Sequence, residues 1–282
     1  MRQSESNEIF ADLELARRLE RTEACGGIEF VEARARATPE SGARWIEVAG
    51  AAALYDGPSS PITQTFGLGM WQELTESDLD RIEAFYGECG ATVCHEVSPL
   101  ADVTTHQLLS RRGYHPVEMT SVMFRSLTGL EPESGRIEVR QAAEREYEEW
   151  ARLAAEGWGE YADLSDLIYD LGLIMAKRRG SLSFLAALDG RLIATAGLCI
   201  AGDVALLTGA STIPRERRQG AQRALLQYRL RFAAECGCRL AMMCALPGSA
   251  SQRNAERSGF RIAYTRIKWG LPAEVSQNIE QS

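Results

Sequence analysis

The sequence predicts an α/β (α+β) protein made of two similar halves, and three observations lead to this prediction. Segments with the alternating pattern of strands are interleaved along the chain with segments of helical spacing. One stretch, residues 126–136 (SLTGLEPESGR), is rich in Gly, Pro, Ser and Glu and has the composition of a linker. On either side of it, short sequence matches recur at a nearly constant offset.

In the first half, a helix is predicted over residues 9–24, because its apolar residues have helical spacing and the following Gly26 and Gly27 are typical of a helix end. A second helix should begin after Thr75, where T-x-x-D with Asp78 approximates a capping box, and a third covers residues 103–112. The predicted strands are residues 28–37, 45–54, 62–68, 91–97 and 117–125.

The second half starts with a predicted strand at residues 137–140, followed by helices over 142–157 and 164–179. The Asp-Gly pair at residues 189–190 is a strong hairpin signal between two further strands. The remaining predicted elements are strands at 183–188, 191–200, 204–212, 240–246 and 261–270, and helices from 221 to 236 and from 251 to 258.

The two halves match each other in sequence. The triplet ECG at residues 88–90 recurs at 235–237, and RGY at 112–114 resembles SGF at 258–260, with offsets of 147 and 146 residues. Two matches at nearly the same offset, in the same predicted elements, indicate a duplicated fold. The alternative is an unrelated α+β domain in which the matches are accidental.

The stretch at residues 208–226 (TGASTIPRERRQGAQRALL) predicts a phosphate-binding turn. It joins the end of a strand to the start of a helix whose apolar residues have helical spacing. A helix start offers free N–H groups and a partial positive charge, and Gly220 lets a ligand approach the backbone. Arg217, Arg218 and Arg223 add full charges, so the turn suits a pyrophosphate.

This turn resembles the acetyl-CoA-binding motif of the GNAT acetyltransferases, Q/R-x-x-G-x-G/A before a helix. Arg217, Gly220 and Ala221 fill the motif, while Gln222 stands where its second small residue is expected. The resemblance implies two tandem GNAT-like domains, each with a mixed, mostly antiparallel central sheet flanked by helices. They would occupy residues 1–128 and 136–271, followed by a C-terminal tail at 272–282.

The first copy of this arrangement is expected to be degenerate. An offset of 147 residues places the segment 70–76 (MWQELTE) opposite the arginine turn. It has no arginine, no glycine and two carboxylates, which would repel a pyrophosphate. We therefore expect residues 1–128 to hold no cofactor and residues 136–271 to bind acetyl-CoA.

The resemblance also implies which residues contact acetyl-CoA as co-substrate. In the family the pantetheine lies along the strand before the turn, which here would involve backbone groups of Ala210 and Thr212. Asn254 is either a pantetheine contact or a solvated helix residue. The full predicted set is Ala210, Thr212, Arg217, Arg218, Gln219, Gly220, Ala221, Gln222, Arg223 and Asn254.

Ser251 is the candidate catalytic residue. Many GNAT proteins protonate the leaving thiolate with a tyrosine, but the matching position here is Ala255. The pattern N-x-x-S-x-x-x-x-E-K-x-G-F of the ribosomal-protein acetyltransferase branch is matched at Ser251, at the acidic–basic pair 256–257 and at the Gly-Phe pair 259–260, while Gly248 replaces the asparagine. The Ser251 hydroxyl would then give the proton, directly or through water. Ser251 could instead cap the helix that follows.

The acceptor pocket is predicted around Trp158, Glu160 and Tyr161, because an aromatic and acidic cluster suits an ammonium group and the family walls its acceptor pocket with this region. Taken alone, Trp158 is better explained as a core anchor within a solvated loop. The cofactor strand carries no obvious general base. The three histidines share no metal-ligand spacing, so they are interpreted as structural or solvated and no metal is expected.

Composition limits the partners. The net charge of −8 argues against nucleic acid and against an anionic membrane surface. Seven scattered cysteines indicate neither a disulfide framework nor a zinc site, which favours a reducing, cytoplasmic location, and the N-terminus lacks the apolar core of a secretory signal. The chain is expected to be a monomer or homodimer.

The sequence thus predicts an N-acetyltransferase in which a small-molecule or peptide amine attacks the thioester of acetyl-CoA directly. The alternative is a non-catalytic acyl-CoA-binding or sensing protein. A third interpretation, an α+β scaffold for protein contacts, implies no CoA binding.

Overall fold

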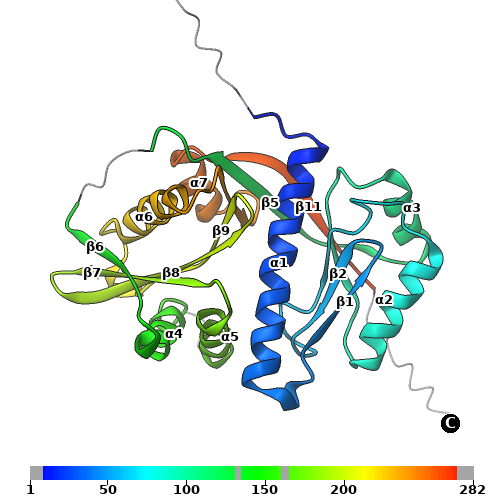
Figure 1. Cartoon of the computed structure of the whole chain (residues 1–282), viewed down its shortest axis with the longest axis horizontal. Coiled ribbons are helices and arrows are strands. Elements are labelled where there is room, and N and C mark those ends of the chain that lie inside the picture. Colours follow the sequence, from blue (N-terminus) through cyan, green and yellow to red (C-terminus); the bar gives the residue numbers. More distant parts are fainter. Residues whose placement is uncertain (1–8, 131–134, 160–164, 272–282) are drawn as a thin grey trace, which may run out of the picture.

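The computed structural model describes residues 9–130, 135–159 and 165–271, so the predicted tail at 272–282 lies outside the described residues. It is a mixed α/β fold in which one long, mostly antiparallel sheet is flanked by helices (Figure 1). None of the helices in the described ranges is long and apolar enough to cross a membrane.

From residue 9 onward, the first half contains three α-helices and five strands. They are α1 (Leu13–Ala37), β1 (Arg44–Val48), β2 (Ala51–Tyr55), β3 (Thr65–Phe66), α2 (Glu76–Glu88), β4 (Cys94–Val97), α3 (Val103–Arg111) and β5 (His115–Ser126). The predicted capping box at the start of α2 is confirmed, since Asp78 N–H donates to Thr75 Oγ1 and Thr75 N–H donates to Asp78 Oδ2.

Several predictions for this half are wrong. The strand predicted at residues 62–68 is only the two-residue β3. The glycine pair does not end the first helix, and residues 28–37 continue α1 instead of forming a strand. The glycines serve close packing: a Cβ on Gly26 would lie 3.3 Å from Leu206 Cδ2, and one on Gly27 would lie 2.3 Å from Leu54 Cδ1. Residues 45–54, predicted as one strand, form the β1–β2 hairpin, whose turn has positive φ at Ala49 and Gly50.

The described residues of the second half form four α-helices and six strands. They are β6 (Ile137–Gln141), α4 (Tyr147–Glu156), α5 (Ser165–Lys177), β7 (Leu182–Leu188), β8 (Arg191–Ala201), β9 (Val204–Thr212), α6 (Ala221–Glu235), β10 (Leu240–Ala245), α7 (Ala250–Arg257) and β11 (Arg261–Gly270). The predicted strands and the last two helices are confirmed to within two residues. The helix predicted from residue 142 starts only at α4, after the short 3-10 turn Glu144–Glu146.

The duplication predicted from the sequence is present in the fold. The series β1, β2, β3, α2, β4, α3, β5 has the same order of strands and helices as β7, β8, β9, α6, β10, α7, β11. The pairing repeats as well, because in both series the first three strands are antiparallel and the third pairs in parallel with the fourth. The two halves are therefore copies of one supersecondary plan.

The two copies exchange their last strands, which joins their sheets into one. The strand order is β1-β2-β3-β4-β11-β5-β10-β9-β8-β7-β6. The last strand of the second half, β11, lies between β4 and β5, and the last strand of the first half, β5, lies between β11 and β10. Figure 1 shows both strands crossing between the halves behind α1. The linker separates the halves in sequence but not in the sheet.

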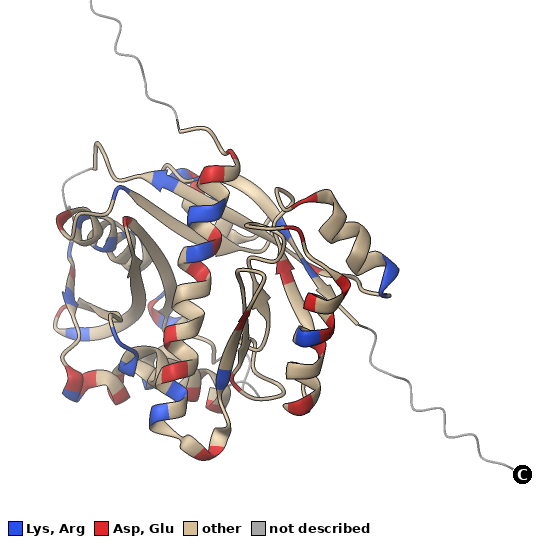
Figure 2. Ribbon diagram, turned by 45° about the vertical axis from the view of Figure 1, so that its right-hand side comes forward, with Lys and Arg blue, Asp and Glu red and all other residues tan. Residues whose placement is uncertain are grey.

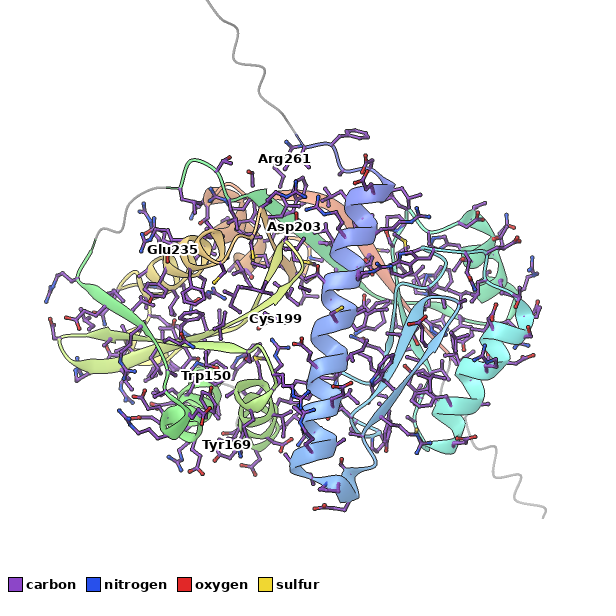
Figure 3. The ribbon with its side chains drawn as sticks, in the orientation of Figure 1. Trp150, Tyr169, Cys199, Asp203, Glu235 and Arg261 are labelled. Carbon is purple, nitrogen blue, oxygen red and sulfur yellow. The ribbon has the colours of Figure 1, made fainter. Side chains whose placement is uncertain are left out.

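Helix α1 also bridges the halves. It contacts β1, β2 and β3 of its own half and β8, β9 and α5 of the other. Its Leu15 and Leu19 belong to one buried cluster with Leu206 and Met242. Charged residues of both signs lie along its length in Figure 2. Arg18 pairs with Asp203 in the β8–β9 turn at 2.9 Å, and Figure 3 shows Asp203 next to α1. The first half thus covers one face of the β9–β10 region.

A buried charge network fixes this bridge. Arg266 of β11 has only 2% of its side chain exposed and contacts three carboxylates, Glu20 at 3.3 Å, Glu23 at 2.7 Å and Glu96 at 3.0 Å. Tyr264 donates to Glu20 at 2.8 Å. Burial raises the pKa of Glu20, while the Arg266 charge opposes that shift. The exchanged strand β11 is therefore tied to α1 and to β4.

Candidate acyl-CoA site

The candidate site forms where two parallel strands of the second half part. The β9–β10 register runs from the Val204–Leu240 pair only to the Leu206–Met242 pair. Beyond it, Leu207, Thr208, Ser211 and Thr212 of β9 stay paired with β8, and residues 243–245 of β10 stay paired with β5. A wedge-shaped gap thus opens in the sheet, with an unpaired backbone edge of β9 along one side.

The helix that begins beside this gap has an open N-terminus. Gly220, the N-cap of α6, has φ +90° and has no side chain that could accept from the helix. The first N–H groups of α6 therefore keep their donor capacity. Arg217, Arg218 and Arg223 around it are exposed, and Arg218 also has positive φ. Donors, helix dipole and guanidinium groups converge on one place, which suits an anion.

Specific contacts hold this turn against its neighbours. Gln222 Nε2 donates to Thr212 Oγ1 at 2.7 Å, which ties the helix start to the strand end. Arg217 Nη2 donates to Gly157 O at 3.0 Å, and Ser211 Oγ donates to Ala154 O at 2.9 Å. These hydrogen bonds hold α4 and the turn in fixed positions relative to β9. Gln222, which departs from the motif, has a structural role here.

A cavity of about 1170 Å³ occupies the gap. Most of the predicted cofactor residues line it: Ala210, Thr212, Arg217, Arg218, Gly220, Ala221, Gln222, Arg223 and Asn254. Gln219 lies outside the lining, where its Nε2 donates to Glu216 Oε2 at 2.7 Å. The volume suits a ligand larger than most single metabolites.

Other lining residues were missed by sequence reasoning. Arg125 comes from the exchanged strand β5, and Gly129 and Leu130 come from the linker, so the first half builds one wall. Arg229 lies two turns into α6, where nothing in the sequence distinguishes it from its neighbours, and Arg257 is predicted only as the basic residue of the acidic–basic pair. Strand exchange leaves no local sequence signal, so Arg125 could not have been found.

Ser251 lines the cavity and is exposed, in the first turn of α7. Its alternative role as helix cap is wrong, because the cap is Ser249, whose Oγ accepts from Gln252 N–H at 3.2 Å. Ala255, at the position of the family's tyrosine, is buried and also lines the cavity. Ser251 and Ala255, one turn apart on α7, therefore line the same cavity.

Trp158 lines the cavity with 45% of its surface exposed, so its alternative as a core anchor is wrong. It follows α4, and its neighbours Glu160 and Tyr161 lie outside the described residues. His95 is fully buried, and burial lowers its pKa to about 3, so it is structural as predicted.

The matching turn of the first half is filled by side chains. A Cβ added to Gly67 would lie 2.3 Å from the Trp71 ring, and one added to Gly69 would lie 2.1 Å from Thr105 Oγ1. Leu68 and Met70 are buried in the core. The N-terminus of α2 is closed by its capping box and carries Glu76 and Asp78 in its first turn.

The fold is that of an α/β protein with a split sheet, and its open, basic helix N-terminus suits an anion. Residues 138–260 match the model of the Acetyltransferase (GNAT) family. The GNAT match thus covers most of the second half of this chain, and the first half repeats the same order of strands and helices.

Solved structures agree on the fold. The GCN5-related N-acetyltransferase from Kribbella flavida matches with a TM-score of 0.62 at 19% identity, covering 86% of this chain and 94% of that one. A tandem GNAT protein from the clavulanic acid biosynthesis pathway matches with a TM-score of 0.51 at 14% identity, covering 77% and 72%. A GCN5-related N-acetyltransferase from Sphaerobacter thermophilus gives 0.51 at 18%, covering 73% and 71%. No curated protein matches the chain in sequence.

Gly220→Val should weaken acetyl-CoA binding at least about tenfold, or about 1.4 kcal/mol. A Cβ at Gly220 meets no atom within 4 Å, so the new side chain would project where the ligand must approach. Isothermal titration calorimetry measures the change.

The matched control is Gly237→Val, just past the other end of α6. Gly237 has φ +86° and an equally open surrounding, so it carries the same backbone strain away from the cavity. Equal acetyl-CoA affinity in the two folded variants would contradict the assignment of the turn.

Proposed function

We propose that this protein is an N-acetyltransferase that transfers the acetyl group of acetyl-CoA to an amine by direct attack on the thioester. The observation that carries the proposal is the cavity between the parted strands, with the open α6 N-terminus and its arginines at one end. This donor set fits the pyrophosphate of CoA, and the free edge of β9 fits its amide-bearing pantetheine arm.

Each part of the site has a role in this proposal. Backbone groups of Ala210 and Thr212 hold the pantetheine and face the thioester oxygen, so that an N–H meets the developing oxyanion. Arg217, Arg218 and Arg223 hold the phosphates. The nitrogen of the amine forms the new amide bond and releases its N–H proton to water. The carbon–sulfur bond breaks, and the leaving thiolate takes a proton from Ser251, directly or through water, while Ser251 regains one from solvent.

The acceptor is proposed to be a small-molecule or peptide amine that enters beside Trp158. An exposed indole at the cavity wall can stack on an ammonium group before that group loses its proton. Glu160 and Tyr161 are proposed to complete this wall.

A second candidate function is non-catalytic binding or sensing of acyl-CoA. The observation that favours it is Ala255, a buried methyl group where many relatives of this fold carry a proton donor. Both functions require acetyl-CoA to bind, so only turnover separates them.

The deciding experiment follows free CoA with a thiol reagent while acetyl-CoA is incubated with a panel of amines, amino acids and aminoglycosides. The enzyme should release CoA steadily with at least one amine, and the product should gain one acetyl group by mass spectrometry. Tight acetyl-CoA binding without amine-dependent release would favour the sensing function. Absence of binding would overturn both.

We further propose that residues 1–128 hold no cofactor. In the first half, the turn before α2 is filled by Trp71 and Thr105. It leads into a helix whose start is capped and acidic. Titration should therefore give one acetyl-CoA per chain. Two equivalent sites per chain would contradict the proposal.

Ser251→Ala should lower turnover toward the low end of the range for general acids, about 10²-fold, with little change in acetyl-CoA affinity. It should cost little stability, because Ser251 is not the cap of α7. Ser251→Thr, which keeps a hydroxyl, should recover part of the activity.

Ser249→Ala is the matched control. It removes the cap and should cost about 1 kcal/mol of stability while the folded protein keeps its turnover. Normal turnover in Ser251→Ala would remove Ser251 from the mechanism.

A further inference from the structure

Arg229 is a buried cation whose hydrogen bonds go to backbone carbonyls. It lies in α6 with 4% of its surface exposed. In the described structure its Nε donates to Leu225 O at 3.2 Å, and its Nη1 donates to Gly197 O at 2.9 Å and to Thr208 O at 3.4 Å. Burial lowers its pKa to about 10. A guanidinium buried at this cost needs a compensating role.

The two strand carbonyls flank an irregularity in the sheet. Thr195 pairs with Ser211 and Gly197 pairs with Thr208, so two residues of β9, Gly209 and Ala210, stand opposite one residue of β8. This is a β-bulge, a feature that commonly re-aims a strand next to an active site. Gly209 adopts φ +57°, and Ala210 is turned out into the cavity.

The opposite face of the bulge is also held. A Cβ on Gly209 would lie 3.0 Å from Met175 Sδ of α5 and 3.5 Å from the Trp150 ring of α4. Trp150 is fixed in turn by its Nε1–H bond to Phe184 O at 3.0 Å, and Figure 3 shows it below β8. The bulge is therefore clamped between α4 and α5 on one face and Arg229 on the other.

Helix α6 connects Arg229, which contacts the bulge, to the phosphate turn at the N-terminus of the helix. Arg229 is eight residues from the first residue of the helix, which corresponds to about 12 Å along a rigid axis. One helix thus fixes the place of the phosphates at its N-terminus and the shape of the strand that faces the thioester. An acyl-CoA bound at both ends would need that spacing to be constant.

We propose that Arg229 is a positioning residue for acetyl transfer, which holds the β8–β9 bulge so that the backbone of Gly209 and Ala210 faces the pantetheine and thioester. The inference rests on the proposed function. It assigns no bond-making step to Arg229, which acts through the strand.

The test compares Arg229→Met, which keeps the length and loses the donors, with Arg229→Lys, which keeps the charge and one donor group. Arg178→Met is the matched control, because Arg178 is also buried and also donates to a backbone carbonyl, Gly26 O at 3.1 Å, at a place outside the cavity lining. Melting temperature is measured for all three variants.

Arg229→Met should lower kcat at saturating acetyl-CoA by about tenfold to a hundredfold. The affinity for adenosine 3′-phosphate 5′-diphosphate, the CoA fragment without the pantetheine arm, should stay unchanged, because the phosphate turn is intact. Arg229→Lys should recover part of kcat. Amide hydrogen exchange over residues 206–213 of the unliganded chain should speed up in Arg229→Met and not in Arg178→Met.

Wild-type kcat in folded Arg229→Met would overturn the inference, and so would unchanged exchange over the bulge. An equal loss of kcat in Arg178→Met would reduce Arg229 to a general stabilising residue and overturn it too. A wild-type chain that binds acetyl-CoA but never turns over would instead refute the proposed catalysis, while the exchange measurement would still decide whether Arg229 holds the bulge.

Discussion

The pairing of β5 with β10 is the constraint on which the split sheet depends. A strand cannot leave its neighbour without exposing unpaired backbone groups, and β10 leaves β9 after only three residue pairs. It can do so because β5 pairs with it over its whole length, from Leu240–Ser126 to Ala245–Ser121. The strand that keeps β10 in place belongs to the first half. The gap of the second half is thus supported by strand exchange with the first, and Arg125 reaches the cavity wall on the same strand.

The two copies share one order of strands and helices, but only the second leaves its turn open to a ligand. In the second copy the turn before the helix is open, basic and without a side-chain cap, and the space beside it is a cavity. In the first copy the same place is filled by Trp71 and closed by the Thr75–Asp78 capping box. A capped, acidic helix start has neither the free donors nor the charge that an anion needs. The first copy instead supplies β5 and α1, which support and cover the second.

Local signals in the sequence placed the strands of the second half. The Asp-Gly hairpin, the turn before α6 and the strand periodicity depend on neighbouring residues, and they gave the positions of the strands and of that turn correctly. They failed at Gly26 and Gly27, because glycines that end a helix and glycines that let a helix approach a sheet look alike in sequence; only the positions of Leu54 and Leu206 distinguish them. Features formed by segments far apart in the chain leave no local pattern in the sequence. The strand exchange and the place of Arg125 in the cavity lining are the main examples.

The two buried arginines, Arg266 and Arg229, differ in how their charges are compensated and in what they do. Arg266 is surrounded by Glu20, Glu23 and Glu96, so its charge is compensated inside the protein and serves to join the halves. The hydrogen bonds of Arg229 go to carbonyl dipoles, which compensate a full charge less completely than carboxylates do. Part of its positive potential therefore reaches the cavity that it lines, together with that of the arginines at the turn. In a chain of net charge −8, this local excess can attract a multiply charged anion where the rest of the surface repels it. The acidic composition and the basic cavity are thus compatible, because the field at the cavity depends on the nearest charges and their degree of burial.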